Sequence, residues 1–156
     1  MPGCVGPVAS LGNLSSLSSF ITSTNNYIPR IASLMHRLCT HFSPPLITLE
    51  NPDGSGTTTY HAFPPPHTWP SELEQLLRKM GFGYRAGFIE SSLTTLRAQF
   101  GDRAGDVEAG LDSWRAKDVN EVRERLLELK GVGRKVADCV MLMCLDQVSC
   151  PQRSHR

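Results

Sequence analysis

A Gly-Val-Gly turn near the end of the chain constrains the fold more than any other stretch. The apolar periodicity predicts one helix that ends near Leu129 and another that begins near Arg134, so Gly131-Val132-Gly133 must connect them tightly. Because glycine adopts positive φ and has no side chain, Gly131 and Gly133 allow a sharp hairpin with an uncovered backbone. The N–H groups of that backbone and the positive end of the second helix can then bind an anion such as a phosphate.

Lys135 lies in the first turn of the second predicted helix, beside Arg134 and close to Lys130. These two charges and the positive helix end disfavour a further cation, so the neutral, nucleophilic amine is favoured. An amine nucleophile forms Schiff bases with carbonyl carbons. A plainer interpretation stays open, in which the stretch is an ordinary helix connection with a basic, phosphate-binding end.

A second turn, Gly81-Phe82-Gly83-Tyr84-Arg85, places an aromatic ring and an arginine side by side at a helix start. Side chains presented in this way can reach outward, the ring as a wedge between bases and the arginine as a donor to an unpaired base. The alternative is that Tyr84 packs on the core and Arg85 is a solvated charge. Asn25-Asn26 similarly forms a corner between two predicted helices, where asparagines most often act as caps.

Composition limits the class of protein. The 156 residues, 40% of them hydrophobic, suffice for one soluble globular domain, and a net charge of +1 restricts any nucleic-acid affinity to a local patch. The five cysteines form no C-x-x-C pair, which argues against a disulfide framework, structural zinc and a four-cysteine iron–sulfur cluster. A reducing intracellular compartment fits this usage, and we expect no metal and no cofactor. No run approaches the ~18 apolar residues of a membrane span.

The sequence divides into three segments. Residues 1–16 are small, Gly-rich and Ser-rich, include no basic residue and resemble no secretory or mitochondrial leader, so they are expected to be disordered or non-native. Residues 17–147 carry the helical pattern of one domain. Residues 148–156 are expected to be an aberrant tail.

Within that domain the apolar spacing predicts an all-α fold. A short helix from Leu17 to a break at Thr24 is followed by helices over about 28–41, 70–80, 84–99, 119–129 and 134–145. The last of these is apolar nearly all round, so we expect it to be the most buried.

Local signals predict the caps and connections of these helices. Asn26, Thr68 and Asp118 are the predicted caps. Residues 43–70 form a connector with at most a strand or two, around 46–49 and 57–60, and residues 101–110 form a polar loop.

Taken in order, the Asn25-Asn26 corner, the turn from Gly81 to Arg85, the glycine hairpin and the run from Lys135 to Cys139 resemble the 8-oxoguanine DNA glycosylase/AP lyases of the helix-hairpin-helix superfamily. The resemblance covers about residues 17–147. It implies a helix-hairpin-helix glycosylase bundle, incomplete at both ends, that acts in base-excision repair on double-stranded DNA containing 8-oxoguanine or abasic sites. We also expect a monomer without membrane association, located in the nucleus, with the mitochondrion as an alternative.

The resemblance implies roles for individual residues. Lys135 matches the lysine that displaces the damaged base and forms a Schiff base at the sugar C1′, and Cys139 matches the residue packed against the flipped base. Asn25, Arg30 and Arg85 match the side chains that hold the orphaned cytosine.

The same comparison implies a DNA-binding surface. Tyr84 matches the wedge beside the orphaned cytosine, and Gly131, Val132 and Gly133 match the phosphate-binding hairpin. Lys130 adjoins that hairpin and is included in the surface, although the family usually has proline there.

The sequence departs from the family after the lysine helix. There the family has a Pro-Val-Asp-x-His-like segment whose aspartate assists departure of the base, whereas the residues after Gln147 include no carboxylate. The only carboxylate side chains after Lys135 are those of Asp138 and Asp146. Both lie on one predicted helix and match structural positions of the family. We therefore expect this chain to be a fragment that is inactive in base excision.

Two other functions stay open. The chain can be a catalytically dead DNA-binding fragment that keeps the hairpin and the strand-holding residues. A glycosylase for oxidised pyrimidines is disfavoured by the lack of a four-cysteine cluster and by the pairs Tyr84-Arg85 and Asp138-Cys139.

Overall fold

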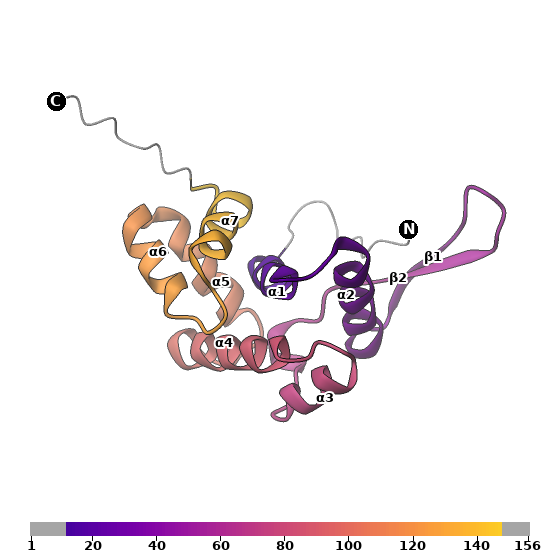
Figure 1. The fold of residues 1–156 in the computed structure, drawn as a ribbon, viewed down its shortest axis with the longest axis horizontal. Helices are drawn as coiled ribbons and strands as arrows, with labels where there is room; N and C mark the ends of the chain where they lie inside the picture. Colours follow the sequence, from indigo (N-terminus) through magenta and orange to yellow (C-terminus); the bar gives the residue numbers. More distant parts are fainter. Residues whose placement is uncertain (1–11, 148–156) are drawn as a thin grey trace.

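The computed structural model describes residues 12–147, which form a bundle of helices with one small β-hairpin (Figure 1). In chain order the elements are α1 (Asn13–Ser23), α2 (Ile28–Phe42), β1 (Pro45–Glu50), β2 (Thr57–His61), the short helix η1 (Pro66–Thr68), α3 (Leu73–Lys79), α4 (Arg85–Phe100), α5 (Asp106–Ser113), the short helix η2 (Trp114–Ala116), α6 (Val119–Leu127) and α7 (Arg134–Cys144). The predicted helical class is confirmed. The expectations for residues 1–11 and 148–156 lie outside the described residues. Across residues 12–147, none of the helices has the length and apolar character needed to cross a membrane.

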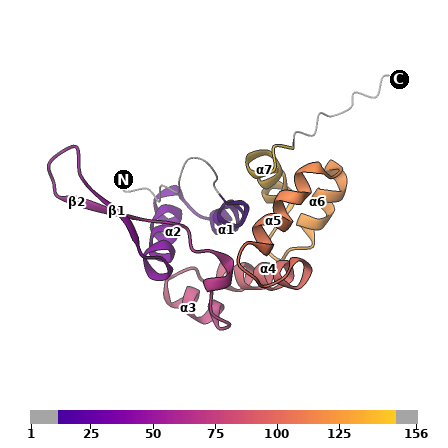
Figure 2. The same ribbon diagram turned by 180° about the vertical axis from the view of Figure 1, so that it is seen from behind.

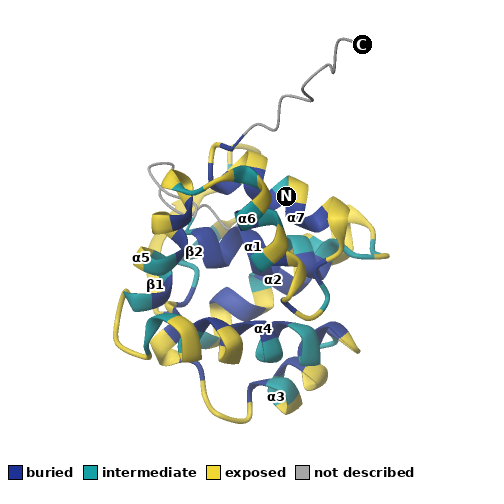
Figure 3. Ribbon diagram, turned by 90° about the vertical axis from the view of Figure 1, so that its left-hand side faces the viewer, coloured by how far each residue is buried: buried dark blue, intermediate teal, exposed yellow. Residues whose placement is uncertain are grey.

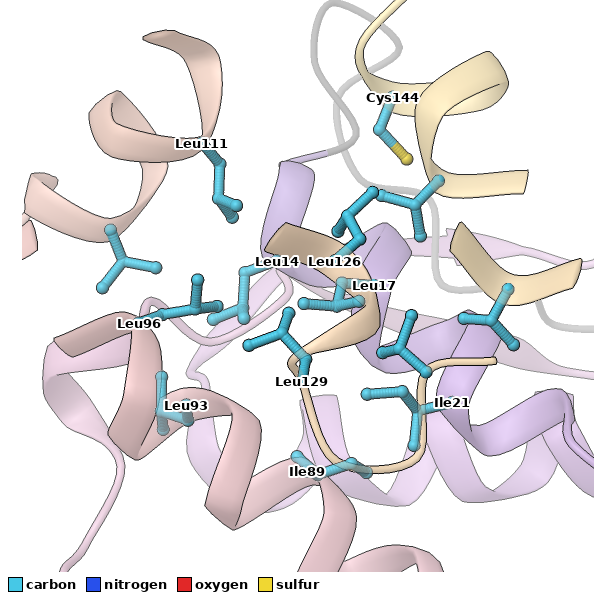
Figure 4. Close-up of a cluster of buried hydrophobic side chains, with 14 of the residues drawn as sticks. Leu14, Leu17, Ile21, Ile89, Leu93, Leu96, Leu111, Leu126, Leu129 and Cys144 are labelled. Atoms are coloured by element: carbon cyan, nitrogen blue, oxygen red, sulfur yellow. The ribbon is translucent and has the colours of Figure 1, made fainter. Parts of the chain in front are cut away.

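The serine-rich helix α1 lies at the centre of the molecule. It separates α2 and α3 on one side from α5, α6 and α7 on the other, and α4 runs beneath α1 and the second group and contacts α3 (Figure 1, Figure 2). Leu14, Leu17 and Ile21 recur at helical spacing and are almost fully buried. Figure 4 shows them among leucines of α4, α5 and α6. Burying each such side chain stabilises the fold by about 1.5–3 kcal/mol, so α1 joins the two groups of helices.

The expectation that the last helix is the most buried is wrong. Val136, Val140 and Met141 of α7 pack into the core, but Leu142 is 53% and Met143 is 69% exposed. The helix packs against α1 and α6 along one side, so Leu142 and Met143 on the other side face solvent. Figure 3 shows the same division between buried and exposed faces along the outer helices. Apolar residue type alone did not distinguish the two faces.

Two sequence predictions failed together, one at residues 13–16 and one at residues 106–110. Residues 13–16 were expected to be disordered but form the first turn of α1, and residues 106–110 were expected to be a loop but form most of α5. The Glu108 carboxylate of α5 accepts hydrogen bonds from the N–H groups of Asn13, at 2.8 Å, and Leu14, at 3.2 Å. These are N–H groups that a helix start cannot satisfy internally. The cap of α1 therefore comes from 95 residues away, beyond the reach of local signals.

Only one of the three predicted caps is correct. The Asp118 carboxylate accepts hydrogen bonds from the N–H groups of Asn120 and Glu121, at 2.9 and 3.3 Å, and caps α6. The amide of Asn26 donates to the Thr22 carbonyl at 3.1 Å, so this side chain closes the end of α1 and does not cap α2. Thr68 belongs to η1, and α3 begins five residues later, at Leu73.

The two strands predicted in the connector are confirmed and pair as an antiparallel hairpin. The hairpin projects away from α1 (Figure 2), and its apolar side chains Leu46, Ile47 and Leu49 are exposed. It therefore adds little to the core, and the predicted site residues all lie elsewhere.

The Glu108 cap predicts a pH dependence of stability. Burial raises the pKa of Glu108 above its ordinary value of 4.5, although its hydrogen bonds to Leu14 and Asn13 act in the opposite direction. Because the folded state then holds the proton more tightly than the unfolded state, the contribution of Glu108 to stability falls as the pH rises through this window. Relative to Glu108→Gln, the wild type should lose free energy of unfolding as the pH is raised from about 4.5.

Urea denaturation at a series of pH values measures this difference, with Asp112→Asn as the control for a neighbouring carboxylate. Parallel pH curves for the wild type and Glu108→Gln would contradict the expected effect.

Candidate nucleic-acid interface and lysine site

The two glycines of the hairpin have different roles. Gly131 has φ +86°, in the left-handed region that favours glycine. Gly133 is extended, with φ −89° and ψ 177°, so the expectation that both glycines use positive φ is wrong for Gly133. A Cβ atom on Gly133 would meet nothing within 4 Å, which leaves its surface open to a ligand.

The hairpin rests on α4. A Cβ atom on Gly131 would lie 2.5 Å from the ring of Phe88, so this glycine is required by contact as well as by conformation. The Ser92 hydroxyl donates a hydrogen bond to the Lys130 carbonyl at 3.1 Å, one turn further along α4. These two contacts fix the hairpin on the surface of a long helix.

The anion-binding groups are fewer than the sequence suggested. Val132 is 5% exposed, and its N–H donates to the Leu129 carbonyl at 3.1 Å, so it stabilises the turn and its N–H does not face solvent. The start of α7 has no side-chain cap and no acidic residue in its first turn, which leaves its N–H groups for an external acceptor. Lys130 and Arg134 are exposed beside it. This end of α7 can hold a phosphate.

Lys135 and Cys139 lie one turn apart on α7, as their spacing predicted. Lys135 is exposed, and Cys139 is a half-buried free thiol. Leu142 and Met143, exposed further along the helix, follow Lys135 by seven and eight residues and so continue the same face. The sequence analysis expected the whole helix to be buried, although counting helical turns from Lys135 would have placed these two residues on its face. The lysine therefore stands at one end of an exposed, largely apolar face.

The two carboxylates that follow Lys135 are both held by arginines. The Asp138 carboxylate accepts from Arg123 of α6 at 3.1 Å, and the Asp146 carboxylate accepts from Arg115 at 2.6 Å. Asp146 lies beyond the end of α7, so the expectation that both aspartates share this helix is wrong. Both carboxylates are therefore ion-paired, and the structural role that the resemblance implied for them stays a prediction.

Arg85 is buried and does not reach outward. It is 6% exposed, and its guanidinium donates to the Thr24 carbonyl at 2.9 Å and the Asn25 carbonyl at 2.7 Å. Both sequence interpretations, an outward donor and a solvated charge, are therefore wrong for this structure. The physical reason is that the corner between α1 and α2 leaves carbonyls without helical partners, and the guanidinium supplies donors for them. Asn25 itself is exposed and has φ +47°, a conformation that asparagine tolerates better than most residues.

Tyr84 links this corner to the hairpin. Its ring is 47% exposed, lies 4.6 Å from the Arg85 guanidinium carbon and packs edge-on against Phe88 at 5.6 Å between ring centroids. Phe88 in turn contacts Gly131. The first turns of α4 therefore connect Asn25, Tyr84 and Arg85 with the hairpin that precedes Lys135.

Arg30 is exposed on α2, where its guanidinium donates to the Gly81 carbonyl at 3.3 Å. This contact places it at the start of the turn that carries Tyr84 and Arg85. All residues predicted to hold the strand opposite the lesion therefore lie on α2, α4 and the corner before α2.

The sequence of this chain is similar to those of N-glycosylase/DNA lyases. No family model matches the sequence. The chain is 37% identical over 133 residues to the N-glycosylase/DNA lyase of Saccharomyces cerevisiae, covering 83% of this chain and 34% of that protein. It is 35% identical over 136 residues to the N-glycosylase/DNA lyase of Arabidopsis thaliana, covering 87% of this chain and 34% of that protein.

Solved structures agree. The fold matches the apo form of the Clostridium acetobutylicum 8-oxoguanine glycosylase/lyase with a TM-score of 0.68 at 28% identity, over 88% of this chain and 43% of that chain. This chain is a relative of the 8-oxoguanine DNA glycosylases. The clostridial glycosylase in complex with double-stranded DNA containing cytosine opposite 8-oxoguanine matches as well, with a TM-score of 0.67 at 27% identity, over 88% of this chain and 42% of that chain.

The chain spans about a third of the length of the curated glycosylases that it matches. The resemblance inferred from four separate motifs is confirmed. The roles assigned to single residues stay predictions, and the geometry around Gly131 and Gly133 allows the first test.

Gly131→Ala should destabilise the fold and Gly133→Ala should not. A left-handed alanine costs about 1–2 kcal/mol, and the contact with Phe88 adds about 1–3 kcal/mol of overpacking. Gly133→Ala should cost less than about 1 kcal/mol, the usual range for a helix start, yet weaken DNA binding because it covers open backbone. Urea denaturation and binding to a labelled duplex measure the two effects separately.

Gly131→Ala combined with Phe88→Ala provides the control. If the clash with the Phe88 ring is the cause, Gly131→Ala should cost less stability in the Phe88→Ala background than in the wild type. Equal costs in the two backgrounds would count against the clash.

Proposed function

We propose that this chain is part of a base-excision repair glycosylase and lyase that binds double-stranded DNA and reacts at the sugar C1′ through Lys135. The observation that carries the proposal is the position of Lys135, exposed in the first turn of an uncapped helix directly after the Gly131-Val132-Gly133 turn. A phosphate held at this helix start places the adjoining sugar beside the lysine. The proposed lesion is 8-oxoguanine, the base after which the similar clostridial glycosylase is named.

The chemistry requires a neutral amine. Lys135 is exposed in the first turn of α7, so its amine can reach a bound sugar. At an abasic site the lysine Nζ adds to the C1′ aldehyde, the carbinolamine loses water, and a Schiff base remains. Withdrawal of a C2′ proton then expels the 3′ phosphate with its electron pair, which cuts the strand.

Excision of an intact base makes a further demand. The base leaves with its electron pair, and positive charge develops on the sugar, so a preorganised carboxylate nearby accelerates the step by ~10² to 10³. Asp138 and Asp146 are engaged by Arg123 and Arg115, which favours a structural role for both. We therefore propose that the 156-residue chain reacts with abasic sites and not with intact 8-oxoguanine.

Borohydride trapping tests this proposal, because hydride reduces the Schiff base to a stable secondary amine. The wild type should be trapped on a duplex with an abasic site and not, above background, on a duplex with 8-oxoguanine opposite cytosine. Lys135→Gln should abolish trapping. Lys130→Gln is the matched control, since it removes an exposed lysine of the same surface and should weaken binding while trapping persists at saturating protein.

Two outcomes would overturn the assignment. Trapping by Lys135→Gln equal to that of the wild type would show that another amine reacts, and efficient trapping on the 8-oxoguanine duplex would show that the carboxylate requirement is met in another way.

The second candidate function is DNA binding without chemistry. The ion pairing of both aspartates favours it, because neither carboxylate is then free to assist departure of a base. The hairpin can hold a phosphate whether or not Lys135 reacts. Retained duplex binding with no trapping on the abasic site would select this alternative.

We also propose that one copy of the chain binds the duplex and that the binding takes place in the nucleus. The hairpin, Lys135 and the corner at Asn25 all belong to one chain, which supports a monomer. The mass of the protein–DNA complex measures how many copies bind, and a dimer would contradict the monomer. Microscopy of a fluorescently tagged chain in cells measures its location, and an exclusively mitochondrial signal would contradict the nucleus.

A further inference from the structure

Two arginines of α2 converge on the end of α3. Arg30 and Arg37 lie seven residues apart, about two helical turns, and so share one face of α2. The Arg30 guanidinium donates to the Gly81 carbonyl at 3.3 Å, and the Arg37 guanidinium donates to the Met80 carbonyl at 3.2 Å. Since these carbonyls are consecutive in the chain, two positive side-chain groups are brought close together.

No carboxylate neutralises this pair within the described residues. The seven ion pairs between residues 12 and 147 include five other arginines and one lysine, but neither Arg30 nor Arg37 has an acidic partner within 4.0 Å. The carbonyls at the end of α3 offset only part of the charge, because its last turn also carries Arg78 and Lys79. Arg30 and Arg37 therefore form a positively charged pair that an anion can neutralise.

An open hollow of about 340 Å³ lies at this pair. Its lining includes Tyr27, Arg30, Ser33, Arg37 and Gly81, and no acidic side chain. Each guanidinium donates one N–H group to a carbonyl just after α3 and keeps further N–H groups for a ligand. The forked N–H groups of a guanidinium match two oxygens of a phosphate. The serine and tyrosine hydroxyls add neutral donors. The chemistry of the hollow is that of a phosphate site.

The position of the hollow indicates the source of the phosphate. Tyr27 follows the Asn25 corner directly, and Gly81 opens the turn that presents Tyr84. Figure 1 and Figure 2 both show α3 below α2, and the hydrogen bonds of Arg30 and Arg37 join the end of α3 to α2. A DNA strand that meets Asn25 and Tyr84 would carry its backbone past the hollow.

We propose that this hollow binds a backbone phosphate of the strand opposite the lesion and that Arg37 is the residue that recognises it. The inference rests on the proposed DNA binding and adds a second phosphate contact, at the turn that precedes α4. A phosphate contact fixes register and reads no base. Arg37 thus positions the strand from which Arg30 and Asn25 are expected to hold a base.

The test is duplex binding of the full chain as a function of salt, for the wild type and Arg37→Gln. Each phosphate contact adds about 0.9 to the slope of log K against log salt concentration, so Arg37→Gln should lower the slope by about that amount. Affinity at low salt should fall by about tenfold, as expected for a charged hydrogen bond. Arg78→Gln, which removes the same charge from α3 where Glu74 already pairs with it, should leave the slope nearly unchanged.

Four duplexes that differ only in the base opposite the abasic site separate phosphate contact from base contact. With a phosphate contact, Arg37→Gln weakens binding equally on all four, and Arg37→Lys restores part of the slope because it keeps the charge. A loss confined to cytosine would overturn the proposal in favour of base recognition.

The remaining outcomes are also decisive. Arg37→Gln with a lower melting temperature but an unchanged slope would show that Arg37 only caps α3, and this inference would fail while the proposed function stands. Absence of duplex binding by the wild type would overturn the proposed function and this inference with it.

Discussion

Burial of α1 between two groups of helices is the constraint on which the rest of the structure depends. A helix rich in serine and threonine is an unusual centre for a core, because each buried hydroxyl needs a partner. The buried Thr22 hydroxyl donates to the Ser18 carbonyl at 2.7 Å, and the half-buried Ser19 hydroxyl donates to the Ser15 carbonyl at 2.8 Å. The small polar side chains also let neighbouring helices approach closely, while the leucines at helical spacing fill the spaces between them.

The second organising element is α4, which supports the corner after α1 and the hairpin before Lys135, two parts that bind DNA in the proposed function. Arg85 in its first turn holds the corner after α1, Tyr84 precedes it at the surface, and Phe88 and Ser92 hold the hairpin. Precision at a reactive lysine depends on the rigidity of the residues that support it. Here the support is one continuous helix, so the strand-holding corner and the lysine-bearing hairpin share a single rigid reference.

The sequence predicted what is determined locally. Apolar spacing located the main helices, Asp118 was recognisable as a cap because its partners follow it directly, and the interval from Lys135 to Cys139 is one helical turn in any helix. Contacts between distant segments were not predictable. The Glu108 cap of α1 and the burial of Arg85 against Asn25 join residues 95 and 60 positions apart, and each overrides the local preference of the residues involved. The difference between Gly131 and Gly133 also depends on a distant residue, because only Phe88 on α4 makes the first of them sterically irreplaceable.

The central position of α1 has a consequence for the order of events during synthesis. This helix emerges from the ribosome before its partners, since its N-terminal cap on α5 is made 95 residues later and its packing partner α7 later still. At bacterial and eukaryotic elongation rates of roughly 5–20 residues per second, α1 waits about 5–20 s without the contacts that stabilise it. A helix of 11 residues is marginal in isolation, so α1 is stabilised by its packing only after α7 has been made.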